Sequence, residues 1–269
     1  MANEQQITME TDWGAQGNQL TGAQVQAFIK GQLQSLHEKD TDLQTQITNI
    51  APELRAATDG CFVTYHRNSD NWPLAVPWWV WPYVEAGGQK ADGVLVLRDG
   101  QAPIIVSPTQ AYLKWSKNAV QGDTVTTSYA TAYTDMSGKT HTAAIMAKGT
   151  QMFGDNQEEW TQYAPAWCNA YDRSYDKGDE EHTKIGIGKG AWWLPSVGEL
   201  VLIWQHKYAI NKCLSVISGA SQLSENWYWA STEGSAAGAW YLYLSGGSLY
   251  GWDAKVSVLG YVRAVAAFH

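Results

Sequence analysis

Hydrophobic positions near the N-terminus follow a seven-residue repeat. Its members are Ile29, Leu33, Leu36, Asp40, Leu43, Ile47, Ile50 and Leu54. Spacings that alternate between four and three place a narrow apolar seam along one helix and are typical of coiled coils. Pro52 should end this helix near Ala51, because proline lacks the amide hydrogen that a helix interior needs. We therefore predict a leader and oligomerising helix over 1–55, which associates through residues 29–54 into a homo-oligomer, with a trimer favoured.

Two features of this repeat leave an alternative open. Asp40 occupies a seam position, where a polar residue lowers stability but can fix register and strand number. Only about 3.5 heptads are present, and a helix that short is marginal on its own. An amphipathic helix that docks on its own domain would show the same pattern.

Alternating β-branched and aromatic residues, separated by turn formers, predict β structure over about 59–148. Within 93–108, the turn Arg98-Asp99-Gly100 indicates a hairpin between two strands. Residues 56–91 are rich in Trp and Pro, and we interpret them as a connecting segment. The remainder, 92–269, is expected to form one domain.

Spacings of three and four between apolar positions predict two helices in the second half of the chain. One covers 156–171, and Pro165 within it is expected to introduce a kink. The other covers 210–217 and ends before Gly219, since glycine commonly terminates helices.

The motif W-W-L-P-S-V-G-E-L, at 192–200, predicts a strand, a stop and a further helix in succession. Pro195 ends the strand, and Ser196 can cap the helix that follows. Glu199 lies three residues later and completes a capping box. This helix is expected to continue to Tyr208.

Only strands are predicted beyond these helices, at 227–232, 239–245, 248–258 and 261–268. Gly246-Gly247 would make a two-residue hairpin between the second and the third of them. Two main helices are thus expected, the first over 156–171 and the second from Ser196 with the helical piece 210–217 after it. Two helices flanked by antiparallel β structure indicate an α+β fold.

Charge and composition exclude several classes of function. Eighteen Lys and Arg against 26 Asp and Glu give a net charge of −8 without a basic cluster, so we expect no nucleic-acid partner. The N-terminus lacks the basic start and apolar run of a signal peptide. The aromatic stretch 72–84 is interrupted by prolines and is too short to span a bilayer, so membrane insertion is not expected.

Aromatic usage is unusual, with 15 Trp and 14 Tyr against 4 Phe. Trp and Tyr combine an apolar face with a polar tip and suit adhesive surfaces. Burial in the core is the alternative for most of the tryptophans.

No convergent set of catalytic residues is found. Cys61, Cys168 and Cys213 are widely spaced and odd in number, so buried thiols are expected rather than a disulfide framework or a zinc site. The six histidines are scattered and belong to no recognisable catalytic motif. The acidic run 179–182 is interpreted as a solvated loop. We expect no enzymatic activity, no cofactor and no bound metal.

Four ordered motifs resemble a known family. They are W-W-L-P-S-x-G-E-L at 192–200, Y-W-A-S-T-E at 228–233, A-W at 239–240 and V-R-A-V-x-A-F at 262–268. The set resembles the C-type-lectin-fold variable proteins of diversity-generating retroelements, including phage tropism determinants and related domains of gut Bacteroides and their phages. The resemblance covers 92–269 and implies a C-type-lectin-like fold there. Ala264 and Ala266 depart from the Pro and the variable or basic residue that the family more often has.

The resemblance also implies a function. In this family, reverse transcription errs at template adenines within a stretch before the final V-R-x-V strand, so that a binding surface varies while the fold stays. The corresponding stretch here is 234–261. The resemblance implies a receptor-binding protein of a phage or prophage, made in the cytoplasm and carried on a virion or an extracellular surface. Its partner would be a protein or glycan receptor on a target cell.

The pyrimidine-ending codons that vary in this family divide the positions of this stretch into scaffold and ligand-binding residues. Pyrimidine-ending codons cannot encode Trp or Lys, so Trp240, Trp252 and Lys255 are expected to form the scaffold of the site. The expected ligand-binding residues are Ser235, Ala236, Tyr241, Tyr243, Ser245, Ser248, Tyr250, Gly251, Asp253, Ser257, Leu259 and Tyr261. Period-2 alternation agrees, since it places Trp240, Leu242 and Leu244 on a core face and the residues between them outside.

Two other functions remain as alternatives. A fixed carbohydrate-binding module would use Trp and Tyr platforms such as Trp72 and Trp79. Calcium-dependent sugar binding is not expected, because the E-P-N, Q-P-D and W-N-D signatures of calcium-binding lectins are missing. A purely structural virion protein is the other alternative.

Overall fold

The computed structural model describes residues 31, 34, 38, 60–178 and 184–268. The chain divides into two units, Met1–Ala57 and Thr58–His269. In the first unit Gly31, Gln34 and Glu38 are helical, and the Gln34 amide donates to the Glu38 carboxylate at 3.4 Å. The seam predicted over 29–54 otherwise lies outside the described residues, as does the acidic run 179–182.

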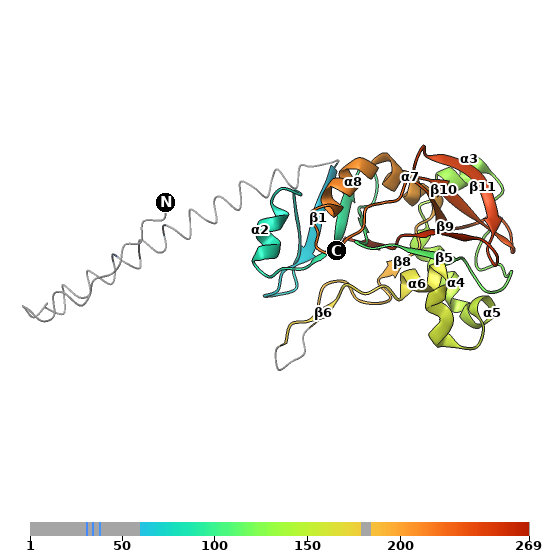
Figure 1. The fold of residues 1–269 in the computed structure, drawn as a ribbon, viewed down its shortest axis with the longest axis horizontal. Coiled ribbons are helices and arrows are strands. Elements are labelled where there is room, and N and C mark those ends of the chain that lie inside the picture. The colour runs from blue at the N-terminus through green and yellow to red at the C-terminus, as the bar shows by residue number, and fades with distance from the viewer. Residues whose placement is uncertain (1–30, 32–33, 35–37, 39–59, 179–183, 269) are drawn as a thin grey trace, which may run out of the picture. The chain divides into compact units, whose positions relative to one another are not determined.

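Two larger sheets form the framework of the second unit (Figure 1). The first has the order β2-β1-β3-β4-β13-β8, with every neighbouring pair antiparallel. Its strands are β1 (Gly60–His66), β2 (Pro73–Val76), β3 (Ala91–Leu97), β4 (Ile104–Val106), β8 (Trp192–Trp193) and β13 (Val265–Ala267). Strand β3 is buried along almost its whole length, as a strand covered on both faces must be.

The second sheet has the order β11-β10-β9-β12-β5. Strands β9 and β12 are parallel, and the other neighbours are antiparallel. Its strands are β5 (Ala111–Lys114), β9 (Trp227–Glu233), β10 (Gly238–Tyr243), β11 (Ser248–Ala254) and β12 (Leu259–Val262). A small separate ribbon pairs β6 (Tyr175–Asp176) with β7 (Lys184–Ile185).

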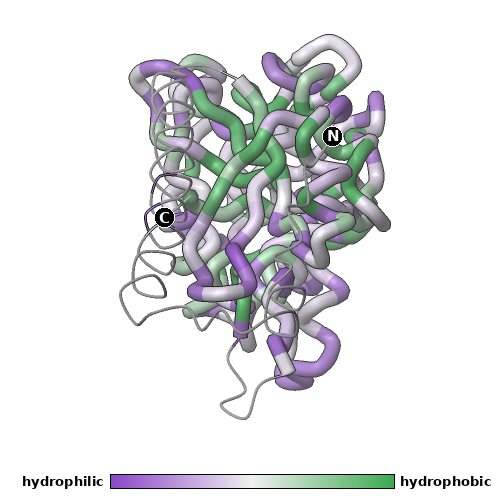
Figure 2. The backbone as a smooth tube through the Cα atoms, turned by 90° about the vertical axis from the view of Figure 1, so that its left-hand side faces the viewer, coloured by the Kyte–Doolittle hydropathy of each residue, from purple (hydrophilic) through white to green (hydrophobic). Residues whose placement is uncertain are grey.

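Short helices pack on these sheets. They are α2 (Trp81–Ala86), α3 (Tyr129–Tyr133), α4 (Gly138–Ala147), α5 (Gly149–Phe153), the 3-10 helix η1 (Gln157–Gln162), α6 (Ala164–Asn169), α7 (Val197–Gln205) and α8 (Lys207–Leu214). Helix α8 packs on β1 and β3 of the first sheet, whereas α7 packs on β9 and β10 of the second. Hydrophobic segments run through the interior of this unit, and hydrophilic ones lie at its periphery (Figure 2). The predicted α+β class, with mostly antiparallel sheets, is confirmed.

Residues 60–91, interpreted from sequence as part of a connecting segment, supply β1, β2 and α2 to this unit. Strand β1 lies between β2 and β3. The prolines occupy places where proline is tolerated, because Pro73 begins the edge strand β2 and Pro82 lies in the first turn of α2. No helix among the described residues is long and apolar enough to cross a membrane.

The hairpin predicted at Arg98-Asp99-Gly100 is confirmed, since β3 and β4 pair on either side of it. The single kinked helix predicted over 156–171 is wrong. Tyr163 has extended dihedral angles (φ −121°, ψ 142°) and separates η1 from α6. Pro165 lies in the first turn of α6, where its missing N–H costs no hydrogen bond, so it starts a helix instead of kinking one.

The predicted capping interaction is present at α7, because the Glu199 carboxylate accepts the Ser196 N–H at 2.8 Å. Helix α7 ends at Gln205, three residues before the predicted end. His206, with φ −104° and ψ 9°, separates α7 from α8. Helix α8 runs over Lys207–Leu214, so it begins and ends earlier than the predicted 210–217.

The turn between β10 and β11 has four residues, 244–247, and the predicted two-residue hairpin is wrong. Leu244 leaves the ladder because its side chain is buried in the core and its N–H donates to the Asn226 carbonyl at 2.9 Å. Strand β11 ends at Ala254 instead of 258, since the chain turns there to bury Lys255.

The last predicted strand, 261–268, is two strands in different sheets. Strand β12 pairs in the second sheet and β13 in the first, and Arg263 and Ala264 make the passage between them. The buried Arg263 guanidinium donates to the Ser221 carbonyl at 2.6 Å, and the Ala264 carbonyl accepts the Ser107 N–H at 2.9 Å. These contacts anchor the chain where it changes sheet.

Candidate ligand-binding surface

Strand β10 separates a core face from an outer face. Trp240, Leu242 and Leu244 are fully buried, as the alternation predicted. Tyr241 and Tyr243 lie between them and are half-buried. Their partners in register on β9 are Trp229 and Trp227, so all four side chains point to the same side of the sheet.

The outer face carries a continuous line of rings, Trp227, Tyr241, Tyr243 and Tyr250, which we name the aromatic row. Successive ring centroids are 4.9, 5.9 and 5.4 Å apart, with the ring planes inclined by 56°, 71° and 82°. Such tilted and edge-to-face pairs each contribute about 0.5–1.5 kcal/mol beyond the area they bury. Tyr250 at the end of the row is 66% exposed. The row is therefore an ordered series of rings that is half-buried along most of its length and exposed at Tyr250.

Sequence reasoning missed Trp227. Trp227 can be identified only from the register of β9 against β10, in which it pairs with Tyr243. Asp253 lies near the row: burial first, and then the Asp253 carboxylate, raise the pKa of Tyr241. The Tyr241 hydroxyl therefore stays protonated at neutral pH and can donate a hydrogen bond.

The loop 234–237, between β9 and β10, contains two of the predicted residues. The Ser235 hydroxyl accepts the N–H groups of Ala237 and Gly238 at 3.2 and 2.9 Å, so it stabilises the loop itself. Ala236 is exposed, and its carbonyl accepts from the Lys255 ammonium at 3.1 Å.

Tyr261 and Leu259 do not join the aromatic row. Tyr261 pairs in parallel register with Tyr228, which points to the side opposite Trp227. The Tyr261 ring packs 5.4 Å from that of Tyr228 and 5.0 Å from that of Tyr112. Leu259 lies two residues before Tyr261 on the same strand and shares its side. The single surface expected over 234–261 is thus divided between two faces of the sheet.

The remaining predicted positions differ in exposure. Ser245 and Ser257 are exposed in turns, and Ser248 is half-buried opposite Tyr243. Gly251 is buried with φ 114°, and a Cβ there would come 3.2 Å from the Tyr129 hydroxyl. It offers no side chain to a ligand, and its backbone conformation disfavours any other residue.

Two of the expected scaffold residues are tryptophans that pack on each other, with ring centroids 5.2 Å apart. Trp240 is fully buried and donates from Nε1 to the Thr126 carbonyl at 2.8 Å. The Trp252 ring is 40% exposed and lies over Gly234 and Gly238, where a Cβ would come within 2.3 Å of ring atoms. The two glycines provide the space that this ring occupies.

Lys255, the third expected scaffold residue, is fully buried and forms an ion pair with the equally buried Glu233. Its ammonium also donates to the carbonyls of Val120 and Ala236, at 3.0 and 3.1 Å, and lies 4.4 Å from the Trp115 ring centroid. Burial lowers the pKa of Lys255, and the Glu233 carboxylate opposes this shift.

Glu233 was not singled out from sequence, although it closes the Y-W-A-S-T-E motif. Its carboxylate also accepts the N–H groups of Gly122 and Asp123 at 2.9 and 2.6 Å. The ion pair therefore connects the loop 234–237 to the segment around Gly122.

A second polar network contacts Thr232 near the end of β9. His141 on α4 bonds Asp123 through Nδ1 at 2.7 Å and Asp135 through Nε2 at 2.9 Å, and the Thr232 hydroxyl donates to Asp135 at 2.6 Å. Burial acts to lower the pKa of His141, but the two carboxylates outweigh it and raise this pKa to about 9. The network ties α4 to the end of β9.

The described residues include three cysteines and no cluster of metal-binding side chains. No group of His, Cys, Asp or Glu in that part of the chain has the arrangement of a metal site. Cys168 and Cys213 are buried thiols, as predicted, whereas Cys61 is half-buried. Burial raises the pKa of Cys213 to about 12, which keeps this thiol protonated and unreactive.

No family model matches the chain, and no curated protein matches it. The chain is similar to the solved structure of a fimbrial protein from Bacteroides ovatus ATCC 8483, with 17% sequence identity and a TM-score of 0.41. The match covers 61% of this chain and 35% of that protein. A likeness at this level carries no argument about function.

Proposed function

We propose that this chain is a non-enzymatic ligand-binding protein of the C-type-lectin-fold variable type and that it binds its ligand through the aromatic row. The observation that carries the proposal is the division of β10 into two faces. Every core-facing side chain from Trp240 to Leu244 is fully buried, whereas Tyr241 and Tyr243 lie outside. Changes at the more exposed end of the outer face, at Tyr243 and Tyr250, would therefore leave the buried side chains of β10 in place.

The composition of this face supports a recognition role. Tyrosine supplies rigid amphipathic area at low entropic cost, and the neighbouring Ser and Gly residues let a partner approach, as in evolved paratopes. The partner is a protein or glycan receptor on a target cell, and the protein is displayed on a virion or an extracellular surface by a phage or prophage. Association through 29–54 would add avidity when several sites engage together.

We expect only some of the predicted ligand-binding residues to contact this partner. Those that lie on or beside the outer face are Tyr241, Tyr243, Ser245, Ser248, Tyr250 and Asp253. We assign Gly251 to the supporting backbone, because its positive φ leaves little freedom to vary.

The encoding locus offers a direct test. We expect a near-copy of the codons for 234–261 beside a reverse transcriptase, with differences at adenines. The differences should fall at outer-face positions such as Tyr243 and Tyr250 and spare Gly238, Trp252 and Lys255. A locus without a repeat and a reverse transcriptase would remove the diversification and leave a fixed module or a structural virion protein.

A carbohydrate-binding module is the second candidate, because two tryptophans outside the row are unusually exposed. Trp72 is 62% and Trp79 is 59% exposed, and exposed aromatic surface marks interaction sites. Glycan-array binding should be measured for Trp79→Ala and Tyr243→Ala side by side. Loss of binding only in Trp79→Ala would favour this candidate, and loss only in Tyr243→Ala would favour the aromatic row.

A further inference from the structure

Two tryptophans lie where the chain enters the second unit. Strands β1 and β2 are antiparallel, and Val63 pairs with Val76 at the last position of β2. Trp78 and Trp79 follow β2 directly, so they lie at the end of this hairpin at which β1 begins with Gly60. Their ring centroids are 5.7 Å apart, with the planes inclined by 88°.

Helices α2 and α8, which lie beside β1 (Figure 1), add further side chains to this end of the hairpin. Tyr83 in the first turn of α2 is 81% exposed. The exposed Lys212 of α8 places its ammonium 4.1 Å from the Trp78 ring centroid. Tyr208 lies one turn earlier on the exposed side of α8 and is also 81% exposed. We name these residues, with Trp79, the entry surface.

The elements that carry the entry surface are fixed to each other. The Glu85 carboxylate on α2 accepts the Ser218 N–H at 3.2 Å and so links α2 to the segment after α8. Trp79 and the two tyrosines therefore keep their exposed positions in an ordered framework. A contiguous exposed patch of large aromatic side chains marks an interaction site.

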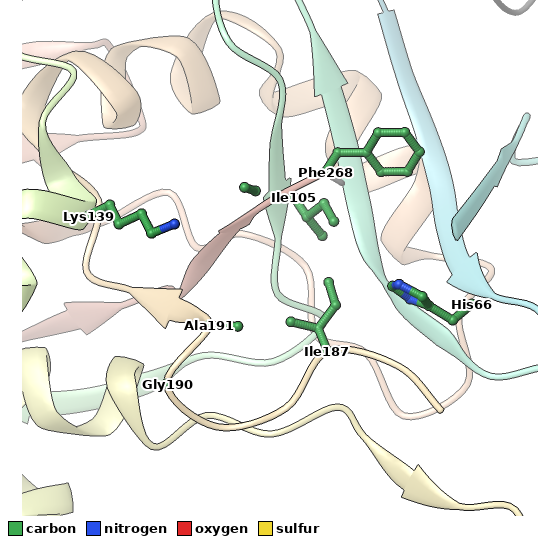
Figure 3. A pocket seen from close by; sticks show the side chains of 8 residues that line it. His66, Ile105, Lys139, Ile187, Gly190, Ala191 and Phe268 are labelled. Atoms are coloured by element: carbon green, nitrogen blue, oxygen red, sulfur yellow. The ribbon is translucent and has the colours of Figure 1, made fainter. Parts of the chain in front are cut away.

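The far end of the β1–β2 hairpin, at His66, is different. It carries one exposed tryptophan, Trp72, and borders a cavity of about 120 Å³ (Figure 3). His66 and Lys139 lie on opposite sides of that cavity with the apolar Ile105 between them, so its polar groups do not converge on one ligand. The two ends of β1 are about 20 Å apart, because a strand rises about 3.3 Å per residue.

The length of the linker before β1 indicates what covers the entry surface. The helix predicted for the leader ends near Ala51, and eight residues, 52–59, connect it to Gly60. Eight residues span at most about 29 Å. Copies of the chain that associate through 29–54 therefore hold the entry ends of their second units close together, at a high effective concentration.

We propose that the entry surface packs against a second copy of this chain in the homo-oligomer. Trp and Tyr are the residues most enriched at the centres of protein interfaces, and the weak contact of one patch suffices when the leader already holds the copies together. The proposal rests on the association through 29–54 that forms part of the proposed function. It also competes with a glycan-binding role for Trp79.

The test is hydroxyl-radical labelling of the full chain, read by mass spectrometry after sedimentation has given the mass of the assembly. Trp79 and Trp72 are matched within one copy, because they are 59% and 62% exposed. In the oligomer Trp79 should label at least about fivefold more slowly than Trp72, since interface centres exclude water. Tyr250 of the aromatic row should label fast in every state.

Two sets of variants make the result specific. Leu36→Asp with Leu43→Asp places charges in the predicted seam and should separate the copies, after which Trp79 labels as fast as Trp72. Trp79→Ser with Tyr83→Ser alters only exposed side chains and should raise the concentration of half-dissociation at least about tenfold. Trp72→Ser is the control and should leave it unchanged.

Two results would overturn the proposal, and they differ in what they imply. An oligomer in which Trp79 labels as fast as Trp72 would leave the leader association intact and show that the entry surface is uncovered. A monomer at about 100 μM, a concentration at which even weak complexes form, would show that the leader does not associate. Neither result bears on binding by the aromatic row, which the Tyr243→Ala variant tests separately.

Discussion

The ammonium of Lys255 and the carboxylate of Glu233 form an ion pair in which neither side chain has any exposure to solvent. Glu233 ends β9 and Lys255 follows β11, so the pair joins the two ends of the stretch that carries most of the aromatic row. Backbone groups complete the coordination of both charges, at Val120 and Ala236 for the lysine and at Gly122 for the glutamate. A buried pair satisfied in this way fixes the position of the loop 234–237.

Removing one member of this pair should be strongly destabilising. Lys255→Met leaves the Glu233 carboxylate buried without its counter-ion, and we expect a loss of about 3–5 kcal/mol in the free energy of unfolding. Urea denaturation measures it, with Lys114→Met as the exposed control that should change stability by no more than about 0.5 kcal/mol. Adding Glu233→Leu to Lys255→Met should recover part of the loss, because no unpaired charge remains. A loss below about 1 kcal/mol in the single variant would contradict the pairing.

Glycine positions under tryptophan rings should be intolerant of alanine. At Gly238 a Cβ would come 2.3 Å from Trp252 Cδ1, so Gly238→Ala must displace the ring and should cost about 1–3 kcal/mol. Gly246 is the matched control in the next turn, since a Cβ there would meet only Ser248 Oγ at 3.7 Å. Unfolding free energies and tryptophan fluorescence check both variants. Equal stabilities would show that Trp252 does not rest on Gly238.

The outer face of β10 could be predicted from sequence because alternation along one strand is a local property. The grouping of 234–261 into one surface could not. Tyr261 lies on the other face because β12 pairs in parallel with Tyr228 of β9, a long-range relation that alternation does not contain. The buried Gly251 lies at the point of β11 where the β10–β11 register shifts, opposite the segment between Trp240 and Leu242. Such an irregularity reverses the side on which later residues point.

In the fold as well, local interactions could be predicted from sequence and long-range pairings could not. The capping interaction of Glu199 depends on residues three apart and was predicted correctly. The division of 261–268 between two sheets depends on anchors distant in sequence, such as Ser221 for Arg263. The strands within 60–91 lie in the stretch 59–148 for which alternation predicts β structure. The Trp- and Pro-rich composition nevertheless favoured a connecting segment over 56–91, although the prolines lie where strands and helices tolerate them.

The three thiols should differ in reactivity in the native protein. Cys168 and Cys213 are buried and burial raises the pKa of both, so neither should react with a thiol reagent such as dithionitrobenzoate at neutral pH. Cys61 is half-buried on β1 and should account for any native labelling. All three should react in denaturant. Native labelling of Cys213 at the same rate as Cys61 would contradict the packing of α8, and a Cys61→Ser variant that still labels would identify such a case.

The His141 network should make stability fall at alkaline pH. The two carboxylates raise the pKa of folded His141 to about 9, against 6.5 as its ordinary value. Because the folded pKa is the higher one, the stabilising contribution is fully present below pH 6.5 and is lost as pH rises towards about 9. The shift corresponds to at most about 3 kcal/mol.

Urea unfolding at several pH values between 6 and 9.5 would measure this loss. Other groups titrate near the upper end of this range, so the informative quantity is the difference between the wild type and His141→Gln. Glutamine retains a hydrogen-bond donor for Asp123 or Asp135 but cannot take up a proton. The stability difference between the two proteins should therefore be largest near pH 6 and shrink steadily to a small value by pH 9.5. If the two curves run parallel across this range, the imidazole does not carry the charge that these carboxylates require.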